Sequence, residues 1–304
     1  MRKFGRALGF AGFVFIVIVI GRYVIVAQDV VTGEWRGDTR VERRDKGDAD
    51  IQLSLERSTS KWGKNQHSNG YSYNDLQGLT RDQAQNGNVT FRIVRDAGTV
   101  ECTGTFVNGK GSGTFRFTPN AGYTEAMRTR GFDFNKSRHH DGDAGDRLFT
   151  AALVNVTIAL ADDIRSNFPD ADVDDLFKAA IFKIDSRFMA EMKATGFPDL
   201  QMEDLVKARI FKVDAEYVRQ VHEMGFDNKS FEGLIKFRIF KVTPDFLAQL
   251  KAEGFNDLDA EDIVKFRIFN IDADFIRKAK AENPNVTVEQ LVHMKIGVHR
   301  RSDD

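Results

Sequence analysis

Ile181-Phe182-Lys183-Ile184-Asp185 is the first of four closely similar stretches in the second half of this 304-residue sequence. The others begin at Ile210, Ile239 and Ile268, so each starts 29 residues after the one before it. A fixed period of this length is typical of stacked supersecondary units and not of a single catalytic core. The period therefore favours a binding or scaffolding protein, although it identifies no partner.

Each period carries the start and stop signals of two short helices. Residue types that cap helix N-termini recur in one column: Asp185, Asp214, Thr243 and Asp272. A glycine followed by phenylalanine then recurs as a C-terminal cap: Gly196, Gly225 and Gly254. A second set of cap residues opens the next helix: Asp172, Gln201, Ser230, Asp259 and Thr287. Because neither helix is long enough to persist alone, stacking must supply the core.

The units at the two ends of this pattern are atypical. A degenerate unit runs from about Ala152 to Ala180, and the last unit loses its glycine at Asn283-Pro284 and is one residue shorter. Such end units are expected because their outer faces meet water. We therefore predict an α-helical repeat domain of about five units, with two short helices per 29-residue unit, over residues 148–304.

Alternating apolar and polar residues dominate the part of the chain that precedes the repeats. Ile51-Gln52-Leu53-Ser54-Leu55 and Val89-Thr90-Phe91-Arg92-Ile93 have the period of half-buried strands. Asn108-Gly109 lies between two further alternating stretches, as in a tight hairpin. The pattern predicts an antiparallel β domain over residues 28–120, with Cys102 on its buried face. A helix and polar linker over 121–147 complete an α+β chain.

The segment from Ser58 to Asn88 interrupts the alternation and is rich in polar and aromatic residues. It contains Trp62, His67, Tyr71 and Tyr73. We interpret it as a long loop that folds back over the sheet. The alternative is a ligand-binding loop, since long loops that carry aromatic side chains often have that role.

The first 27 residues have the composition of a targeting or anchoring segment. Arg2 and Lys3 precede an uninterrupted apolar and glycine run from Phe10 to Ile20. This order fits a cleaved secretory signal peptide that ends near Ala27. The competing interpretation is a retained membrane anchor over residues 7–27, which is near the length that a bilayer-spanning helix needs. Both interpretations place the remainder outside the cytoplasm, in the periplasm or secreted.

Charge and cysteine content exclude several classes of protein. The net charge of −1 provides no overall positive field for nucleic acid. Cys102 is the only cysteine, so an intramolecular disulfide framework is excluded. Gly111-Ser112-Gly113 precedes strand-like sequence and lacks the strand-turn-helix setting of a nucleophile elbow. We find no catalytic residue set and expect no cofactor.

Two columns of basic residues run through the repeats. The lysines of one column each follow an acidic residue by four positions, which is a favourable helical ion pair: Lys178, Lys207, Lys236 and Lys265. The arginines of the other have no acidic residue three or four positions away: Arg209, Arg238 and Arg267. We hypothesise that these arginines dock a protein or an anionic envelope component, and the alternative is a salt bridge to a neighbouring unit or cap.

One short stretch between the two predicted domains has the composition of a metal site. His139, His140, Asp141 and Asp143 supply two imidazoles and two carboxylates within five residues. Their spacing matches neither HExxH nor a complete calcium loop. We interpret the stretch as a polar linker, with metal binding as the alternative.

Two groups of motifs together resemble a known family. One comprises Leu76-Gln77-Gly78-Leu79-Thr80, Arg95-Asp96-Ala97-Gly98-Thr99 and Gly111-Ser112-Gly113-Thr114-Phe115, and the other is the repeat itself. The combination resembles uncharacterised bacterial envelope proteins. It is also similar to the extracytoplasmic C-terminal region of membrane zinc metallopeptidases of the beta-lactam sensor-transducer type. HExxH is absent from this sequence, so the resemblance implies an envelope protein without the peptidase activity.

These observations together favour a non-enzymatic, extracytoplasmic module for protein–protein interaction or ligand sensing. Two alternatives remain at this stage. One is a metal-dependent hydrolase that uses His139, His140 and Asp141, and the other is a structural spacer in the envelope.

Overall fold

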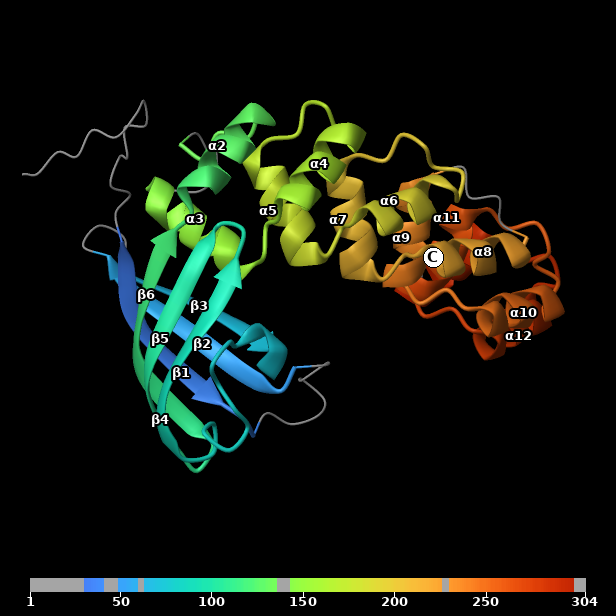
Figure 1. Ribbon diagram of the computed structural model, residues 1–304. Coiled ribbons are helices and arrows are strands. Elements are labelled where there is room, and N and C mark those ends of the chain that lie inside the picture. Colours follow the sequence, from blue (N-terminus) through green and yellow to red (C-terminus); the bar gives the residue numbers. More distant parts are fainter. Residues whose placement is uncertain (1–29, 41–48, 60–62, 136–142, 226–229, 298–304) are drawn as a thin grey trace, which may run out of the picture.

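The computed structural model describes residues 30–40, 49–59, 63–135, 143–225 and 230–297. It has a six-stranded antiparallel sheet in its N-terminal part and, within the described residues, twelve α-helices after it. Figure 1 shows the sheet at one end of the molecule, with the helices extending away from it. The predicted α+β class is confirmed. The predicted signal or anchor segment, residues 1–27, lies outside the described residues.

The sheet consists of two three-stranded meanders joined at β1 and β6. Its spatial order is β3-β2-β1-β6-β5-β4, and all neighbours are antiparallel. The strands are β1 Val31–Asp38, β2 Ile51–Thr59, β3 Gly63–Tyr71, β4 Gly87–Arg95, β5 Gly98–Val107 and β6 Lys110–Pro119. Trp35 of β1 pairs with Leu55 on one side and with Gly113 on the other, which fixes the register at the join.

One face of the sheet is buried around Trp35. Its ring lies 5.3 Å from that of Phe91 and 5.4 Å from that of Phe106, and its Nε1 donates a hydrogen bond to the Thr103 carbonyl at 3.2 Å. A Cβ at Gly104 would lie 2.7 Å from the Trp35 ring, so this close approach requires glycine. Cys102 lies on the same face with no exposed surface, as predicted. Burial raises the pKa of its thiol far above the usual range, so it is not a reactive thiolate.

The predicted hairpin at Asn108-Gly109 joins β5 to β6. Both residues have positive φ, 50° and 75°, as the two central residues of a type I′ turn require. Asparagine and glycine are the residue types that tolerate this conformation best, and the predicted hairpin is confirmed.

The polar segment after β2 differs from its prediction. Gly63–Tyr71 is not a loop but the edge strand β3, which pairs with β2 along its length. Residues 72–86 do fold back over the sheet, and Leu76, Leu79 and Ala84 are buried there. They include the short 3-10 helix η1, Tyr73–Asp75. Trp62 lies outside the described residues.

The helical part begins directly after β6, with α2 Ala121–Thr129 and α3 Ala144–Leu153. The helices that we call first helices are α4 Ile158–Asn167, α6 Ser186–Lys193, α8 Ala215–Glu223, α10 Pro244–Ala252 and α12 Ala273–Glu282. Those that we call second helices are α5 Val173–Phe182, α7 Met202–Phe211, α9 Phe231–Ile239, α11 Ala260–Ile268 and α13 Val288–Ile296. Every predicted N-cap residue stands at the N-cap position of one of these helices.

Helix α3 fastens the helices to the sheet. The Phe149 ring stacks on that of Phe115 at 5.1 Å and contacts that of Phe117 at 5.4 Å. At the rim, Asn69 of β3 donates a hydrogen bond to the Leu153 carbonyl at 3.1 Å. Aromatic stacking and edge hydrogen bonds thus join the sheet to the first turns of the helical part.

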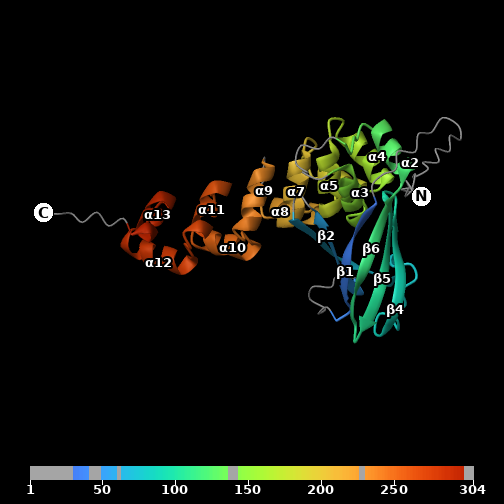
Figure 2. The same ribbon diagram turned by 90° about the vertical axis from the view of Figure 1, so that its left-hand side faces the viewer.

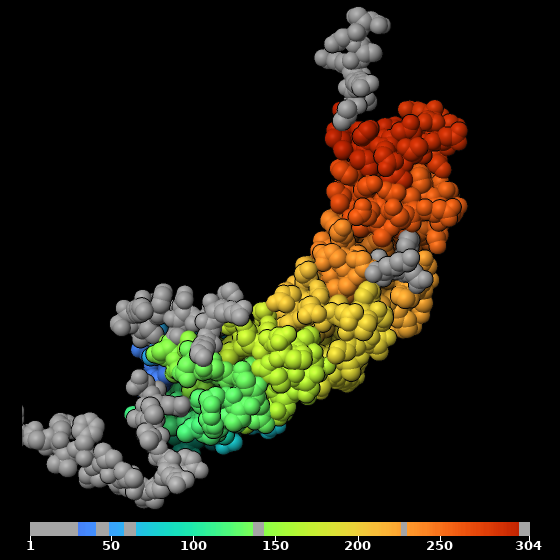
Figure 3. All heavy atoms as spheres, turned by 90° about the horizontal axis from the view of Figure 1, so that it is seen from above, coloured from blue at the N-terminus to red at the C-terminus, as the bar shows by residue number. Residues whose placement is uncertain are grey.

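The second helices pack on one another in chain order, α5 on α7, α7 on α9, α9 on α11 and α11 on α13. Figure 2 shows α9, α11 and α13 in one row, with α8, α10 and α12 in a second row below it. Seen from above, the helical part forms a curved, elongated body (Figure 3). Its long surface is the setting for the candidate site.

Within the described ranges, no single helix has the length and apolar composition to cross a membrane. Only α3 and α4 taken together meet those criteria, and they meet at an angle of 96°.

Candidate docking surface

The turns that end the second helices share one hydrogen-bonding pattern. In α5 the Ile184 N–H donates to the Ala179 carbonyl at 2.8 Å, and the Lys183 N–H donates to the Ala180 carbonyl at 3.3 Å. The same pair of bonds ends α7, α9 and α11. This is the Schellman motif, whose pivotal residue adopts a left-handed conformation. Here the pivotal residues have φ between 49° and 55°: Lys183, Lys212, Lys241 and Asn270.

Lysine is an unfavourable residue at this position. A residue with a Cβ pays about 1–2 kcal/mol for left-handed backbone, and natural Schellman turns therefore favour glycine or asparagine. Three of the five first helices follow that preference, since the predicted glycine caps have φ of 94°, 87° and 83°: Gly196, Gly225 and Gly254. The lysines at the ends of α5, α7 and α9 are therefore not explained by the backbone that they occupy.

These three lysines also lack an ionic partner. The side chains of Lys183, Lys212 and Lys241 are exposed. Among the residues that the structure describes, no carboxylate forms an ion pair or hydrogen bond with any of them. Their ammonium groups point into solvent and are available to an external anion.

An exposed isoleucine lies two residues before each pivotal residue. The exposed fractions are 54% for Ile181, 52% for Ile210, 45% for Ile239 and 46% for Ile268. Ile296 of α13, just before Gly297, continues the series at 53%. We call these five residues the isoleucine row. They make up five of the six large apolar side chains that are exposed on the described helices, the sixth being Met294.

The predicted arginine column lies directly beside this row. The guanidinium carbon of Arg209 lies 3.7 Å from the Phe188 ring centroid, that of Arg238 lies 4.1 Å from Tyr217, and that of Arg267 lies 4.8 Å from Phe246. Lys295 of α13 occupies the equivalent place over the Phe275 ring at 4.5 Å. Each cation therefore stacks on a ring of the preceding first helix.

Each arginine also donates a hydrogen bond to a carbonyl in the preceding turn. Arg209 donates to the Lys183 carbonyl, and Arg238 Nη2 donates to the Lys212 carbonyl at 2.8 Å. Arg267 donates to the Phe240 carbonyl at 2.8 Å. These contacts give the arginines an intramolecular role, with a carbonyl acceptor in place of the expected carboxylate. That they dock a partner stays a prediction.

The predicted lysine column forms ion pairs, but with different acids from those expected. Lys178 Nζ lies 2.7 Å from Glu203 and Lys207 Nζ lies 3.1 Å from Glu232, in each case on the next second helix. Lys236 with Glu261 and Lys265 with Glu289 continue the series at 3.7 and 3.8 Å. These four acids lie across the helix–helix interface, and Lys178 and Lys265 also pair with the acid three positions earlier, Asp175 and Asp262, at 3.0 and 2.7 Å. Burial disfavours the charged Lys178, but its hydrogen bonds to Glu203 and Asp175 outweigh this and raise its pKa to about 12.

We call the turns at Lys183, Lys212 and Lys241 the lysine turns, and the carboxylates that follow two of them by two residues cap the next helix. Asp185 accepts a hydrogen bond from the Phe188 N–H, and Asp214 accepts one from the Tyr217 N–H, both at 2.8 Å. These N-cap bonds hold the carboxylates on their own helices. The edge formed by the lysine turns and the isoleucine row thus presents unpaired lysines and apolar side chains to solvent, beside the exposed N-cap carboxylates of Asp185 and Asp214.

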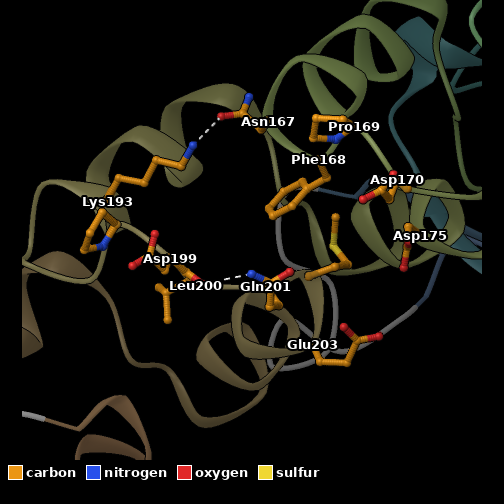
Figure 4. A pocket seen from close by; sticks show the side chains of 13 residues that line it. Asn167, Phe168, Pro169, Asp170, Asp175, Lys193, Asp199, Leu200, Gln201 and Glu203 are labelled. Carbon is orange, nitrogen blue, oxygen red and sulfur yellow. Dashed lines mark hydrogen bonds between the residues drawn. The ribbon is translucent and has the colours of Figure 1, made fainter.

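The opposite end of the second helices is different in character. A hollow of about 380 Å³ lies between the turns that precede α5 and α7 (Figure 4). Asp170, Asp175, Asp199 and Glu203 line it, and Lys193 at its rim donates to Asn167 at 2.9 Å. Acids at helix N-termini are favoured by the helix dipole, which accounts for this composition.

The residues considered for chemistry are not assembled into a site in the described structure. His139, His140 and Asp141 lie outside the described residues, and Asp143 caps α3 by accepting from the Asp146 N–H at 2.8 Å. Across the described ranges, no three His, Cys, Asp or Glu residues are grouped closely enough to hold a metal ion. Searches of protein-family models, curated proteins and solved structures returned no match to this chain.

Proposed function

We propose that the helical part is an array of about five two-helix units that binds a protein partner without catalysis. The isoleucine row is the observation that carries this proposal. A single exposed isoleucine is normal on a protein surface. Five exposed isoleucines at the same end of successive second helices, three of them beside an exposed lysine, make a recurring surface feature of the kind that marks interaction sites.

The recurrent contacts support the array. The lysine–glutamate pairs and the arginine stacks each link one unit to the next, as expected when every unit contacts only its neighbours. Long, curved surfaces of this type present the same group repeatedly along one edge. A partner that binds several units gains from every one of them.

The location of the protein belongs to the same proposal. The basic and apolar N-terminal sequence supports an extracytoplasmic protein, either secreted or anchored through residues 7–27. The resemblance to the extracytoplasmic region of sensor-transducer metallopeptidases points in the same direction. We infer a sensing or docking role in the cell envelope, with the sheet and the array both outside the cytoplasm.

Site-specific photo-crosslinking tests the proposal in the cells that make the protein. A photoreactive amino acid replaces Ile210, and in a control it replaces Asp199 in the hollow on the opposite side. We expect a discrete covalent adduct with another protein from position 210 and none from position 199. If neither position yields an adduct, the proposal is wrong.

A further inference from the structure

We propose that the isoleucine row and the lysine turns bind an extended acidic polypeptide segment with an apolar side chain at every third residue. This inference rests on the proposed function and names the chemistry of the partner. Three observations carry it, namely the spacing of the row, its width and its unpaired charge.

The spacing of the row matches a polyproline II helix. Packed helices lie about 8–10 Å apart, so neighbouring members of the row on successive second helices are separated by about that distance. A polyproline II chain rises about 3.1 Å per residue with three residues per turn, so every third side chain returns to the same face after about 9.3 Å. In a β-strand every second side chain lies on the same face, about 6.6 Å apart, which does not match the spacing of the isoleucine row.

The width of the row favours an extended chain over a helical partner. An α-helix also returns to one face after seven residues, or about 10.5 Å, but it buries an apolar stripe more than 100° wide. The row is a single isoleucine wide, and the next residue of each unit, Phe211 or Phe240 for example, is partly buried in the protein. One apolar side chain per unit is therefore the complementary pattern.

The charge beside the row selects an acidic partner. Lys183, Lys212 and Lys241 flank Ile181, Ile210 and Ile239, and within the described part of the chain they form no ion pair. Each is held in a backbone conformation that glycine would adopt at lower cost. Carboxylates between the apolar residues of the partner would pair with these ammonium groups. The strain in each turn is then explained by a side chain that is needed there.

Fluorescence anisotropy with synthetic peptides and the full-length protein tests this inference. The probe is a labelled peptide of four Asp-Pro-Leu triplets, which adopts the polyproline II conformation and is long enough to follow the row. Comparison peptides are four Lys-Pro-Leu triplets, a sequence with the same composition but clustered leucines, and an acidic amphipathic helix with a heptad repeat. We expect the Asp-Pro-Leu peptide to bind at least about tenfold more tightly than any of them, and binding to weaken with salt.

Two triple variants with the same change in net charge separate docking from general attraction. K183G/K212G/K241G keeps the turns, since glycine suits their backbone, and should weaken binding of the peptide about tenfold or more. K207Q/K236Q/K265Q removes three lysines from the lysine–glutamate pairs and should change binding less than about threefold.

Equal binding of all peptides, tighter binding of the heptad helix, or equal loss in both variants would overturn the inference. An adduct at position 210 together with no selectivity for the Asp-Pro-Leu peptide would leave the interaction function standing and reject this partner chemistry. Absence of any adduct would reject the function itself.

Discussion

Three first helices and three second helices end in a left-handed turn, but the two groups use different residues to make it. Gly196, Gly225 and Gly254 end three first helices, whereas Lys183, Lys212 and Lys241 end three second helices. Glycine adopts the left-handed backbone conformation without steric cost, whereas lysine does not. The contrast teaches that backbone preference accounts for the glycines but not for the lysines, for which we propose a docking role.

The largest change in stability is expected from a core residue that lies next to the isoleucine row. Phe237 and Ile239 lie two residues apart in α9, with 0% and 45% exposure respectively. Phe237→Ala should lower the free energy of unfolding by about 3–5 kcal/mol because it leaves a cavity. Ile239→Ala should change it by less than about 0.5 kcal/mol. Chemical denaturation measures both, and a similar loss for the two variants would place the isoleucine row in the core.

The next largest change in stability is expected when a glycine turn of a first helix receives the lysine of a second helix. Gly196 has φ of 94°, and an added Cβ there would meet no atom within 4 Å. Gly196→Lys should therefore destabilise the protein by about 1–2 kcal/mol, from backbone strain alone. Gly196→Asn is the matched control and should cost less, since asparagine tolerates the left-handed region. Equal stability of the lysine variant and the wild type in urea would show that the turn tolerates any residue.

The arginine beside each lysine turn should matter for stability. Arg238 stacks over Tyr217 and donates to the Lys212 carbonyl. Arg238→Gln should lower the free energy of unfolding by about 1–2 kcal/mol, because it removes the cation–π contact and a charge-assisted hydrogen bond. Arg219→Gln, on an exposed face of α8, is the control and should have little effect. If Arg238→Gln instead abolishes partner binding at unchanged stability, the arginine column is part of the docking surface.

The reverse exchange should stabilise the protein slightly. Lys212→Gly relieves the left-handed strain at φ of 55°, and we expect a gain of about 0.5–1 kcal/mol. Lys212→Ala is the control, since alanine removes the charge but retains the Cβ. Thermal unfolding should show a higher Tm for the glycine variant only. A lower Tm would mean that the lysine side chain makes a stabilising contact.

The smallest effect should come from the ion pairs between second helices. The hydrogen bond from Lys178 lowers the pKa of Glu203, so this pair stabilises the protein above the ordinary pKa of 4.5 and its contribution is lost as the pH falls through the lowered value. Because the pair is partly exposed, Glu203→Gln should cost only about 0.2–1 kcal/mol at neutral pH. The difference from wild type should vanish in acid, and a difference that persists at low pH would rule out an electrostatic origin.

Local signals in the sequence predicted much of the fold. The N-caps, the glycine caps and the Asn108-Gly109 turn each depend on a few neighbouring residues with strong conformational preferences. Strand β3 was missed because its residues are mostly polar and it lies at the sheet edge. Its pairing with β2 is a long-range contact that no local pattern reveals.

The candidate surface was predicted only in part. The arginines of the column were recognised, but their acceptors are backbone carbonyls, which a sequence does not display. One feature of the sequence indicated the left-handed turns, since Asn270 and Gly297, residue types that tolerate this conformation, stand at the ends of α11 and α13. No feature of the sequence indicated that the isoleucines are exposed, because isoleucine is among the residues most often buried.

Photo-crosslinking from position 210 in the K183G/K212G/K241G background tests the central claim most directly, with the Tm of the same variant measured alongside. The account predicts that the Tm rises or stays constant while the adduct yield falls well below that of the protein with its three lysines. An unchanged yield would contradict the claim that these lysines are present for a partner.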